Sequence, residues 1–181
     1  MFNPAPATVM HIDLNSCFAT IEQQANPLYR GLPLVVAAYT TDRGCILAAS
    51  VEAKRLGIKT GMYVGDGKRL SPKLIVLPSD PPKYRFVNRK LLALLSEYSA
   101  LVEVKSIDEM VMKMNTELGI LNTAKEIKKR IKNEIGDWLT VSIGIAPNRY
   151  LAKIASNLHK PDGLDVIDSN NIERTLGSLQ L

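Results

Sequence analysis

The sequence predicts an α/β (α+β) fold, in which a ferredoxin-like body with a mixed or antiparallel sheet and helices is interrupted by a small α/β insertion. Strand and helix patterns outside residues 29–82 follow one another in the order β, α, β, β, α, β, then α, β, which is the split βαβ order with two further elements. Residues 29–82 contain short strand patterns of their own. The chain has 181 residues, of which 46% are hydrophobic and 23% charged, so it can bury a packed core.

The amino-terminal part is expected to begin with an apolar strand at residues 9–14, which places Asp13 at the carboxyl end of a strand. Helical turns follow at residues 15–24. The insertion should contain a hairpin, a short helix and one further strand, at residues 34–38 and 45–49, 51–56, and 74–77 respectively. Residues 61–68 are rich in glycine but miss the spacing of a phosphate-binding loop, and they are interpreted as a surface turn.

The remaining helices are indicated by apolar residues at three- and four-residue intervals. One is expected at residues 84–98, and a capping-box pattern at Thr123 predicts the start of another that ends at Gly136. Two strand-like segments are separated only by Asp108 and Glu109, which places both acids at or near the tip of a hairpin. The strands are expected at residues 102–107, 110–114, 139–146 and 164–167, with a last helix at residues 148–158.

Charge and residue counts limit the classes of function. Lys and Arg number 23 against 18 Asp and Glu, and the formal net charge of +5 favours a polyanionic partner. Cys17 and Cys45 form no C-x-x-C pair, so neither a zinc site nor a disulfide framework is expected, and His11 and His159 are interpreted as structural or surface residues. With no basic leader and no apolar stretch near the roughly 18 residues of a membrane span, a soluble intracellular protein is expected.

Three carboxylates at strand ends form the candidate site. If the first strand and the central hairpin are neighbours in one sheet, Asp13, Asp108 and Glu109 converge on one edge. Oxygen ligands suit Mg²⁺, and two ions roughly 3.5 to 4 Å apart can stabilise the attacking and leaving oxygens of a phosphoryl transfer. Both hairpin acids can face the ions only if the chain bends between them. The alternative is that Asp13 caps the following helix and that the hairpin pair is a solvated turn.

Five segments of the chain form an ordered set of motifs. They are residues 11–22 (HIDLNSCFATIE), 26–33, 49–61, 106–109 (SIDE) and 142–163. This set resembles the motifs of the Y-family (UmuC/DinB-like) DNA polymerases, in which residues 11–22 are similar to the first metal motif and residues 106–109 to the second. The resemblance covers nearly the whole chain, which is identified on these motifs as a member of the family.

The resemblance implies a division into named domains. Residues 1–16 and 84–175 would form the catalytic palm, residues 17–83 the fingers, and residues 176–181 the start of a linker to a thumb. The thumb and little-finger domains, which supply most duplex contacts in the family, are expected to be absent from this sequence. Binding of DNA is therefore expected to be weak and strongly salt-sensitive.

The resemblance also implies a two-metal nucleotidyl transfer. Asp13, Asp108 and Glu109 would be the catalytic acids, and with the backbone carbonyl of Leu14 they would ligate two Mg²⁺ ions, for which Mn²⁺ can substitute. The primer 3′-hydroxyl would attack the α-phosphate of a dNTP, and pyrophosphate would leave. The expected partners are a DNA primer–template and a deoxynucleoside triphosphate.

Residues implied to contact the incoming nucleotide are Asn15, Ser16, Cys17, Phe18, Ala48, Val51, Lys54 and Lys160. Phe18 aligns with the aromatic steric gate that excludes a ribose 2′-hydroxyl, with an ordinary core ring as its alternative, and Lys160 and Lys54 would face the triphosphate. Many relatives carry Tyr and Arg where this chain has Val51 and Lys54, which keeps a solvated lysine as the alternative for Lys54. Small residues implied to cover the nascent base pair are Cys45, Ala49, Ser50 and Gly61.

The family acts in translesion synthesis and DNA repair, so a cytoplasmic, nucleoid-associated enzyme without membrane contact is expected. Clamp or accessory subunits would bind through the domains expected to be absent. Two alternatives remain open. A non-catalytic binding protein would keep the fold without extending a primer. A diguanylate-type nucleotide cyclase shares the palm topology, but it would carry a Gly-Gly-(Asp/Glu)-Glu-Phe turn where this chain has SIDEM at residues 106–110.

Overall fold

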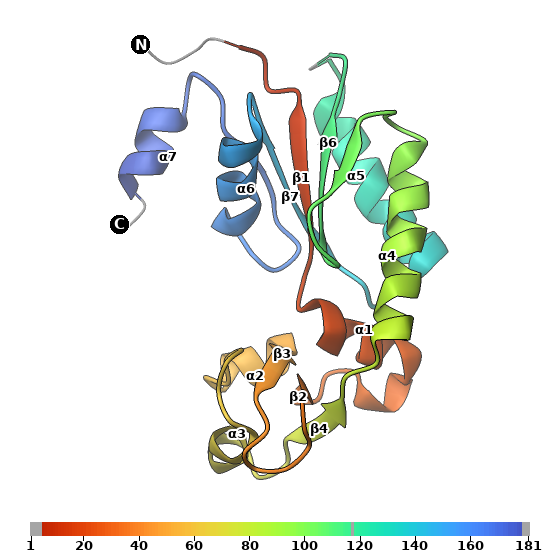
Figure 1. Cartoon of the computed structure of the whole chain (residues 1–181). Coiled ribbons are helices and arrows are strands. Elements are labelled where there is room, and N and C mark those ends of the chain that lie inside the picture. Colours follow the sequence, from red (N-terminus) through yellow and green to blue (C-terminus); the bar gives the residue numbers. More distant parts are fainter. Residues whose placement is uncertain (1–4, 117, 179–181) are drawn as a thin grey trace. The chain divides into compact units, whose positions relative to one another are not determined.

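The computed structural model describes residues 5–116 and 118–178, which divide into two units (Figure 1). Each unit is built around its own sheet. The segments of unit 1 are the residues up to Asn15, Arg89–Ile135 and the residues from Thr140 onward, and those of unit 2 are Ser16–Asn88 and Gly136–Leu139.

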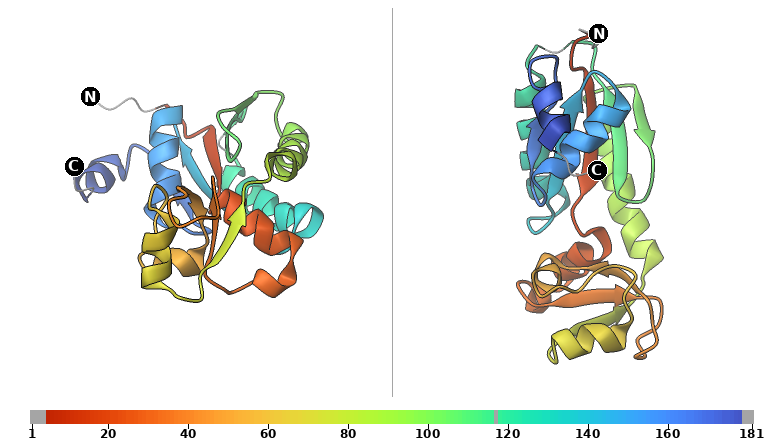
Figure 2. Two further views of the ribbon diagram at one scale, coloured as in Figure 1. Left: turned by 60° about the horizontal axis from the view of Figure 1, so that its bottom comes forward. Right: turned by 90° about the vertical axis from the view of Figure 1, so that its left-hand side faces the viewer.

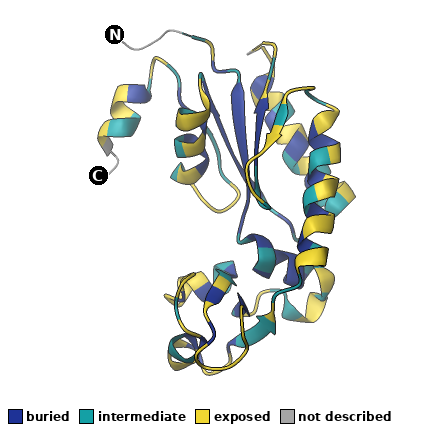
Figure 3. Ribbon diagram, in the orientation of Figure 1, coloured by how far each residue is buried: buried dark blue, intermediate teal, exposed yellow. Residues whose placement is uncertain are grey.

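Unit 1 contains a five-stranded sheet with the order β5-β6-β1-β7-β8. The strands are β1 (Val9–Leu14), β5 (Val102–Val104), β6 (Glu109–Lys113), β7 (Val141–Ala146) and β8 (Leu164–Val166). All neighbouring strands are antiparallel except β7 and β8, which are parallel. The expected mixed sheet is confirmed. Its central strand is β1, which is buried along its whole length, as is β7 (Figure 3).

Helices cover both faces of this sheet. They are α5 (Ile120–Arg130), the π-helical turn η2 (Ile131–Ile135), α6 (Arg149–Leu158) and α7 (Ile172–Ser178). Because successive strand residues point to opposite faces, Val9 joins an apolar cluster with Ala152 and Ala155 of α6. Met10 and Ile12 are fully buried on the other face, the side on which Figures 1 and 2 show α5. The sheet is therefore enclosed between α6 and α5.

Unit 2 contains a three-stranded sheet with the order β3-β2-β4. Its elements are α1 (Cys17–Ala25), the 3₁₀ turn η1 (Pro27–Tyr29), β2 (Leu34–Ala37), β3 (Ile46–Ala49), α2 (Val51–Arg55), α3 (Val64–Leu70) and β4 (Ile75–Pro78). Strands β2 and β3 form the expected antiparallel hairpin, and β4 pairs with β2 in parallel. The core of the unit is made of Val35, Ala37, Ile46, Ala49, Ala53, Ile58, Val64 and Leu74.

The long helix α4 (Pro81–Ser96) begins in unit 2 and continues into unit 1 after Asn88. Tyr84, Leu91 and Leu95 are almost completely buried, which confirms the apolar stripe expected from their spacing. The alternation of buried and exposed positions is visible along the helix in Figure 3. Across the part of the chain that the structure describes, no helix combines the length and apolar character required to cross a bilayer.

The prediction of a surface turn at residues 61–68 is wrong, because α3 begins at Val64 and includes most of this segment. Val64 and Gly67 are buried, and a Cβ atom added to Gly67 would lie 2.9 Å from Leu74 Cδ2. Glycine allows the helix to approach the core this closely, but it also lowers helix propensity and leaves no apolar side chain in the pattern. Packing therefore determines this helix, and the local sequence does not reveal it.

The predicted start of α5 at a Thr123 capping box is also wrong. The helix begins at Ile120, after Gly119 with φ of 75°, and the Thr123 hydroxyl donates a hydrogen bond of 3.3 Å to the Gly119 carbonyl. Burial of the Ile120 side chain stabilises the extra turn. The strand expected at residues 102–107 ends earlier, at Val104, because the residues after it form the hairpin turn.

Candidate active site

Two of the three predicted acids lie side by side, one at the end of the central strand β1 and one at the start of β6. In the sheet register, Asp13 of β1 is directly opposite Glu109 of β6 on one side and Ser142 of β7 on the other. Side chains of directly opposed residues project from the same face, which here is the face covered by α6. The Asp13 side chain is 11% exposed and that of Glu109 is 23% exposed. Asp13 does not cap α1, because the cap position is Ser16.

Asp108 lies in the hairpin turn beside these acids, as its sequence position predicted. The backbone amides of Lys105 and Ser106 both donate to the Glu109 carbonyl, at 2.9 and 3.2 Å, and this closes the turn. The Asp108 carbonyl accepts a 2.9 Å bond from the amide of Leu14, and its carboxylate accepts a 2.5 Å bond from the Ser106 hydroxyl. Asp108 is thus tied to β1 by its backbone.

Two lysine ammonium groups neutralise the paired acids. Lys160 donates a 2.6 Å hydrogen bond to Asp13 Oδ2, and Lys153 donates to both carboxylate oxygens of Glu109, at 2.7 and 2.6 Å. Burial raises the pKa of Asp13, and the bond from Lys160 offsets only part of that rise. Burial alone would also raise the pKa of Glu109, but Lys153 outweighs it and holds that pKa below its ordinary value. Lys153 belongs to the last of the five motifs, but its sequence position did not predict a place at the site.

The His11 side chain projects from β1 on the same face of the sheet as the Glu109 side chain of β6. It is 2% exposed, its Nε2 atom is 3.5 Å from Glu109 Oε2, and its Nδ1 atom is 3.3 Å from the Ser156 hydroxyl. Burial lowers the pKa of His11, so the neutral ring is favoured. The sequence interpretation as a structural residue did not anticipate its contact with a candidate catalytic acid.

Asn15 connects the end of β1 to the loop that follows α6. The side chain is 4% exposed, and its amide nitrogen donates a 2.9 Å bond to the Ser142 hydroxyl. Its carbonyl oxygen accepts bonds from the Asp162 amide at 2.8 Å and the Thr140 hydroxyl at 3.2 Å. The Asn15 side chain therefore holds in place the loop that carries Lys160.

The same loop is held from α5 and η2 through Asp162. The Asp162 carboxylate pairs with Lys128 at 2.9 Å and Lys132 at 3.0 Å. Burial alone would raise the pKa of Asp162, but the two lysines outweigh it and lower that pKa. The loop is therefore held through both the backbone amide and the carboxylate of Asp162.

The part of the first motif that belongs to unit 2, residues 16–22, forms the start of α1. Ser16 adopts a left-handed conformation with φ of 51°, and its hydroxyl accepts a 2.9 Å bond from Lys54. Cys17 is buried. The half-buried ring of Phe18 stacks on Tyr84, with ring centroids 4.3 Å apart and an interplanar angle of 12°. Lys54 and Ser16, both predicted to contact nucleotide, are thus in direct contact.

The small residues of unit 2 fall into two groups. The segment at Cys45 runs beside that at Gly61, because Ile46 donates its amide to the Met62 carbonyl at 2.8 Å and Gly61 donates to the Ile46 carbonyl at 2.8 Å. Gly61 has φ of 90°, which explains glycine there. Ala48 and Val51 are half-buried and Ala49 is buried. The fully buried Ser50 accepts a 3.2 Å bond from the Ala53 amide, so its side chain caps α2.

A groove of about 580 Å³ opens beside Glu109 in unit 1. Its lining residues come from β1, β6, the hairpin and α6: His11, Lys105, Glu109, Val111, Arg149, Tyr150, Lys153, Ile154 and Asn157. The stretches of the chain that the structure covers contain no group of three or more His, Cys, Asp or Glu side chains arranged to hold a metal ion. Asp13 and Glu109 are brought together, while Asp108 stays bonded to Ser106.

Comparison with known proteins places the chain in a family. Residues 12–157 match the profile of the impB/mucB/samB family. DNA polymerase IV 1 of Bacillus subtilis (strain 168) is 41% identical over 175 residues, which cover 94% of this chain and 42% of the relative. DNA polymerase IV of Sulfurisphaera tokodaii is 33% identical over 178 residues, which cover 96% of this chain and 51% of the relative.

Solved structures agree with this placement. A Y-family DNA polymerase chimera superimposes with a TM-score of 0.88 at 32% identity, over 96% of this chain and 52% of the other. DinB from Sulfolobus solfataricus superimposes with a TM-score of 0.84 at 33% identity, over 93% of this chain and 50% of the other. The chain spans about half the length of these proteins, or less. It belongs to the impB/mucB/samB family, within the Y-family of DNA polymerases that its motifs resemble.

Proposed function

We propose that this chain is the catalytic part of a DNA-directed DNA polymerase that adds dNTPs to a primer during translesion synthesis. The observation that carries the proposal is the pairing of Asp13 with Glu109 across the central strands, each carboxylate held by a cationic group. The relatives named DNA polymerase IV support it. The palm would comprise residues 1–16 and 84–175 and the fingers residues 17–83.

The donor atoms suit hard divalent cations. Asp13 and Glu109 present carboxylate oxygens from one face of the sheet, and each already binds an ammonium in the position where a cation is favoured. Asp108 and Leu14 lie next to these acids, because the Leu14 amide donates a backbone hydrogen bond to the Asp108 carbonyl. These groups would hold two Mg²⁺ ions, or Mn²⁺ in their place, and the ions would supply Lewis-acid activation of the primer hydroxyl and the phosphate.

The other residues would position the substrates. Lys160, once released from Asp13, would bind the triphosphate, and Lys54 would do so after leaving the Ser16 hydroxyl. Phe18, stiffened by stacking on Tyr84, would lie against the deoxyribose and exclude a 2′-hydroxyl. The small side chain of Cys45 and the glycine at position 61 would leave room for a base pair.

The partners would be a DNA primer–template and a dNTP. Solved relatives include an insertion ternary complex and a post-insertion binary complex of Dbh DNA polymerase, which supports this assignment. Clamp or accessory subunits would bind through thumb and little-finger domains rather than through the palm or fingers. The place of action would be the nucleoid of the cytoplasm.

Primer extension at low salt tests the function directly. With Mg²⁺, wild-type protein is expected to extend a labelled primer, and Asp108→Ala is expected to abolish extension. Glu173→Ala, an exposed acid on α7, serves as the matched control and should extend like wild type. Absence of extension at high protein and DNA concentrations, despite measurable binding, would favour the non-catalytic alternative.

A further inference from the structure

Three oxygen atoms of the loop that carries Lys160 surround the ammonium of Lys128 on α5. The ammonium lies 2.9 Å from Asp162 Oδ1, it donates to the Asp162 carbonyl, and it donates a 3.0 Å bond to the Gly163 carbonyl. An ammonium has three N–H donors, so the loop supplies as many acceptors as Lys128 has donors. The side chain is only 16% exposed, and the loop has therefore replaced most of its water.

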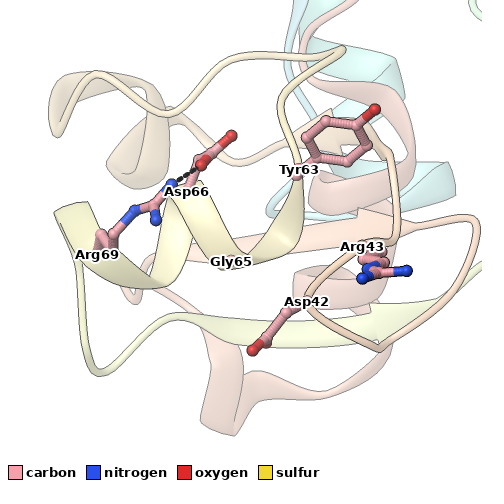
Figure 4. A pocket seen from close by; sticks show the side chains of 6 residues that line it. All are labelled: Asp42, Arg43, Tyr63, Gly65, Asp66 and Arg69. Carbon is pink, nitrogen blue, oxygen red and sulfur yellow. Dashed lines mark hydrogen bonds and ion pairs between the residues drawn. The ribbon is translucent and has the colours of Figure 1, made fainter.

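The pair formed by Lys68 and Asp42 shows the ordinary form of a lysine–aspartate contact in this chain. Asp42 lines an open pocket of about 670 Å³ in unit 2 (Figure 4), and Lys68, which is 45% exposed, approaches one of its carboxylate oxygens at 2.8 Å. A pair of this kind is screened by water and restrains the chain weakly. Lys128 differs because it is largely buried and because it also binds main-chain carbonyls.

Asp162 has a backbone conformation that these contacts stabilise. Its φ is 60°, in the left-handed region that residues with a side chain rarely adopt. Such a conformation persists where the surrounding structure holds it. Here the Asp162 amide donates a 2.8 Å bond to Asn15, and the carboxylate contacts Lys132 at 3.0 Å in addition to Lys128.

Gly163 joins the same loop to β7. Its carbonyl accepts a 3.0 Å bond from the Ile143 amide, and its own amide donates to the Ser142 hydroxyl at 3.3 Å. A Cβ atom added to Gly163 would lie 2.5 Å from the His159 carbonyl, so glycine is required for this close approach. The main chain after Lys160 is therefore fixed by β7, by α5 and by Asn15.

A fixed main chain leaves the Lys160 side chain as the part that moves. Its ammonium is 2.6 Å from Asp13 Oδ2, and its flexible four-carbon stem allows it to move from Asp13 to a phosphate. We propose that Lys128 is a positioning residue for triphosphate binding, because it holds the backbone at residues 162–163 and thereby keeps Lys160 within reach of the phosphates. The inference rests on the proposed polymerase function, which supplies the dNTP.

Equilibrium binding of a fluorescent dATP tests the proposal without a catalytic step. The labelled dATP is titrated, with Mg²⁺ present, onto protein bound to a primer–template whose primer ends in a dideoxynucleotide. Lys128→Met is expected to weaken binding about tenfold, because the loop then no longer fixes Lys160. Lys128→Arg keeps the charge and should bind more tightly than Lys128→Met. Lys125→Met, an exposed lysine on the same helix, is the matched control and should bind like wild type.

A double-mutant cycle with Lys160→Gln separates positioning from a general structural effect. If Lys128 acts through Lys160, Lys128→Met should change the affinity by less than about twofold once Lys160 is replaced. Equal thermal unfolding temperatures establish that the loss is local. If Lys128→Met unfolds at a lower temperature, Asp162→Gly repeats the cycle, because glycine adopts a φ of 60° freely and removes only the carboxylate.

The outcomes also separate this inference from the proposed function. If Lys128→Met binds like Lys125→Met, or loses the same factor with and without Lys160, the positioning role is wrong, and Asp108-dependent extension by wild type would leave the function standing. If the loss requires Lys160 but no Asp108-dependent extension occurs, the positioning role is supported and the function is wrong. Failure of wild-type protein to bind the labelled dATP would overturn the positioning role.

Discussion

Lys153 should compete with a divalent ion for Glu109. Its ammonium lies 2.6 and 2.7 Å from the two carboxylate oxygens. Mg²⁺ or Mn²⁺ binds carboxylate oxygen at about 2.0 to 2.2 Å, so the ion and the ammonium cannot occupy the same side of the carboxylate. Replacement of Lys153 by Met, which keeps a long apolar stem, should therefore raise the affinity of the site for the ion.

The size of this effect follows from two contributions. The Lys153 side chain is 50% exposed and that of Glu109 is 23% exposed, so breaking their ion pair costs only about 0.5 to 1 kcal/mol. A displaced ammonium roughly 8 Å from a divalent ion in water adds a repulsion of about 1 kcal/mol at low salt. Together these predict roughly ten- to thirtyfold tighter Mn²⁺ binding for Lys153→Met.

Free Mn²⁺ measured by electron paramagnetic resonance at pH 7 and low salt gives the affinity without any catalytic step. Lys129→Met, an exposed lysine on α5, is the matched control and should bind Mn²⁺ like wild type. When Glu109→Gln is also present, Lys153→Met should no longer raise the affinity for Mn²⁺. Equal or weaker Mn²⁺ binding by Lys153→Met would show that the lysine orders Glu109 for the ion and does not oppose it.

Three further predictions concern stability and selectivity. Gly144→Ala should destabilise unit 1 by about 3 kcal/mol in urea unfolding, because the added Cβ would lie 2.0 Å from the Ala152 carbonyl, whereas Gly177→Ala, which meets nothing within 4 Å, should change stability by less than about 1 kcal/mol. The pKa of Asp162 is lowered in the folded state, so its contribution to stability is present above the unfolded pKa of about 3.9 and is lost as pH falls through the folded pKa. When unfolding is measured at decreasing pH below about 4, Asp162→Asn should therefore lose less stability than wild type. Phe18→Ala should admit ribonucleotides in primer extension, and an unchanged preference for dNTPs would count against its role as a gate.

Local patterns predicted the positions of the candidate acids well. The apolar run before Asp13 gave a strand with the expected bounds, and the adjacency of Asp108 and Glu109 correctly indicated a hairpin turn. Two adjacent acids within one strand would point to opposite faces of the sheet, but only Glu109 lies in β6 and Asp108 lies in the turn before it. Short-range alternation carries this information, since a strand and its turn are set by neighbouring residues.

Contacts between distant segments were beyond the sequence patterns. Lys153 lies in the last of the five motifs without a predicted role, and its bond to Glu109 depends on the close packing of α6 on β7 at Gly144. The contact of His11 with Glu109 depends on strand register, which a single strand pattern does not give. The helix α3 was missed for the related reason that Gly67 fits against the core by lacking a side chain.

The central place of β1 has a consequence for synthesis of the protein on the ribosome. Its two neighbours, β6 at Glu109–Lys113 and β7 at Val141–Ala146, are translated long after Leu14. At roughly 5 to 20 residues per second, the buried residues of β1 remain without a partner strand for about 5 to 20 seconds. The sheet of unit 2 is complete at Pro78 and can form during this interval. The strand that carries Asp13 is therefore made well before both of its partner strands, and its apolar residues are open to aggregation and chaperone binding during that interval.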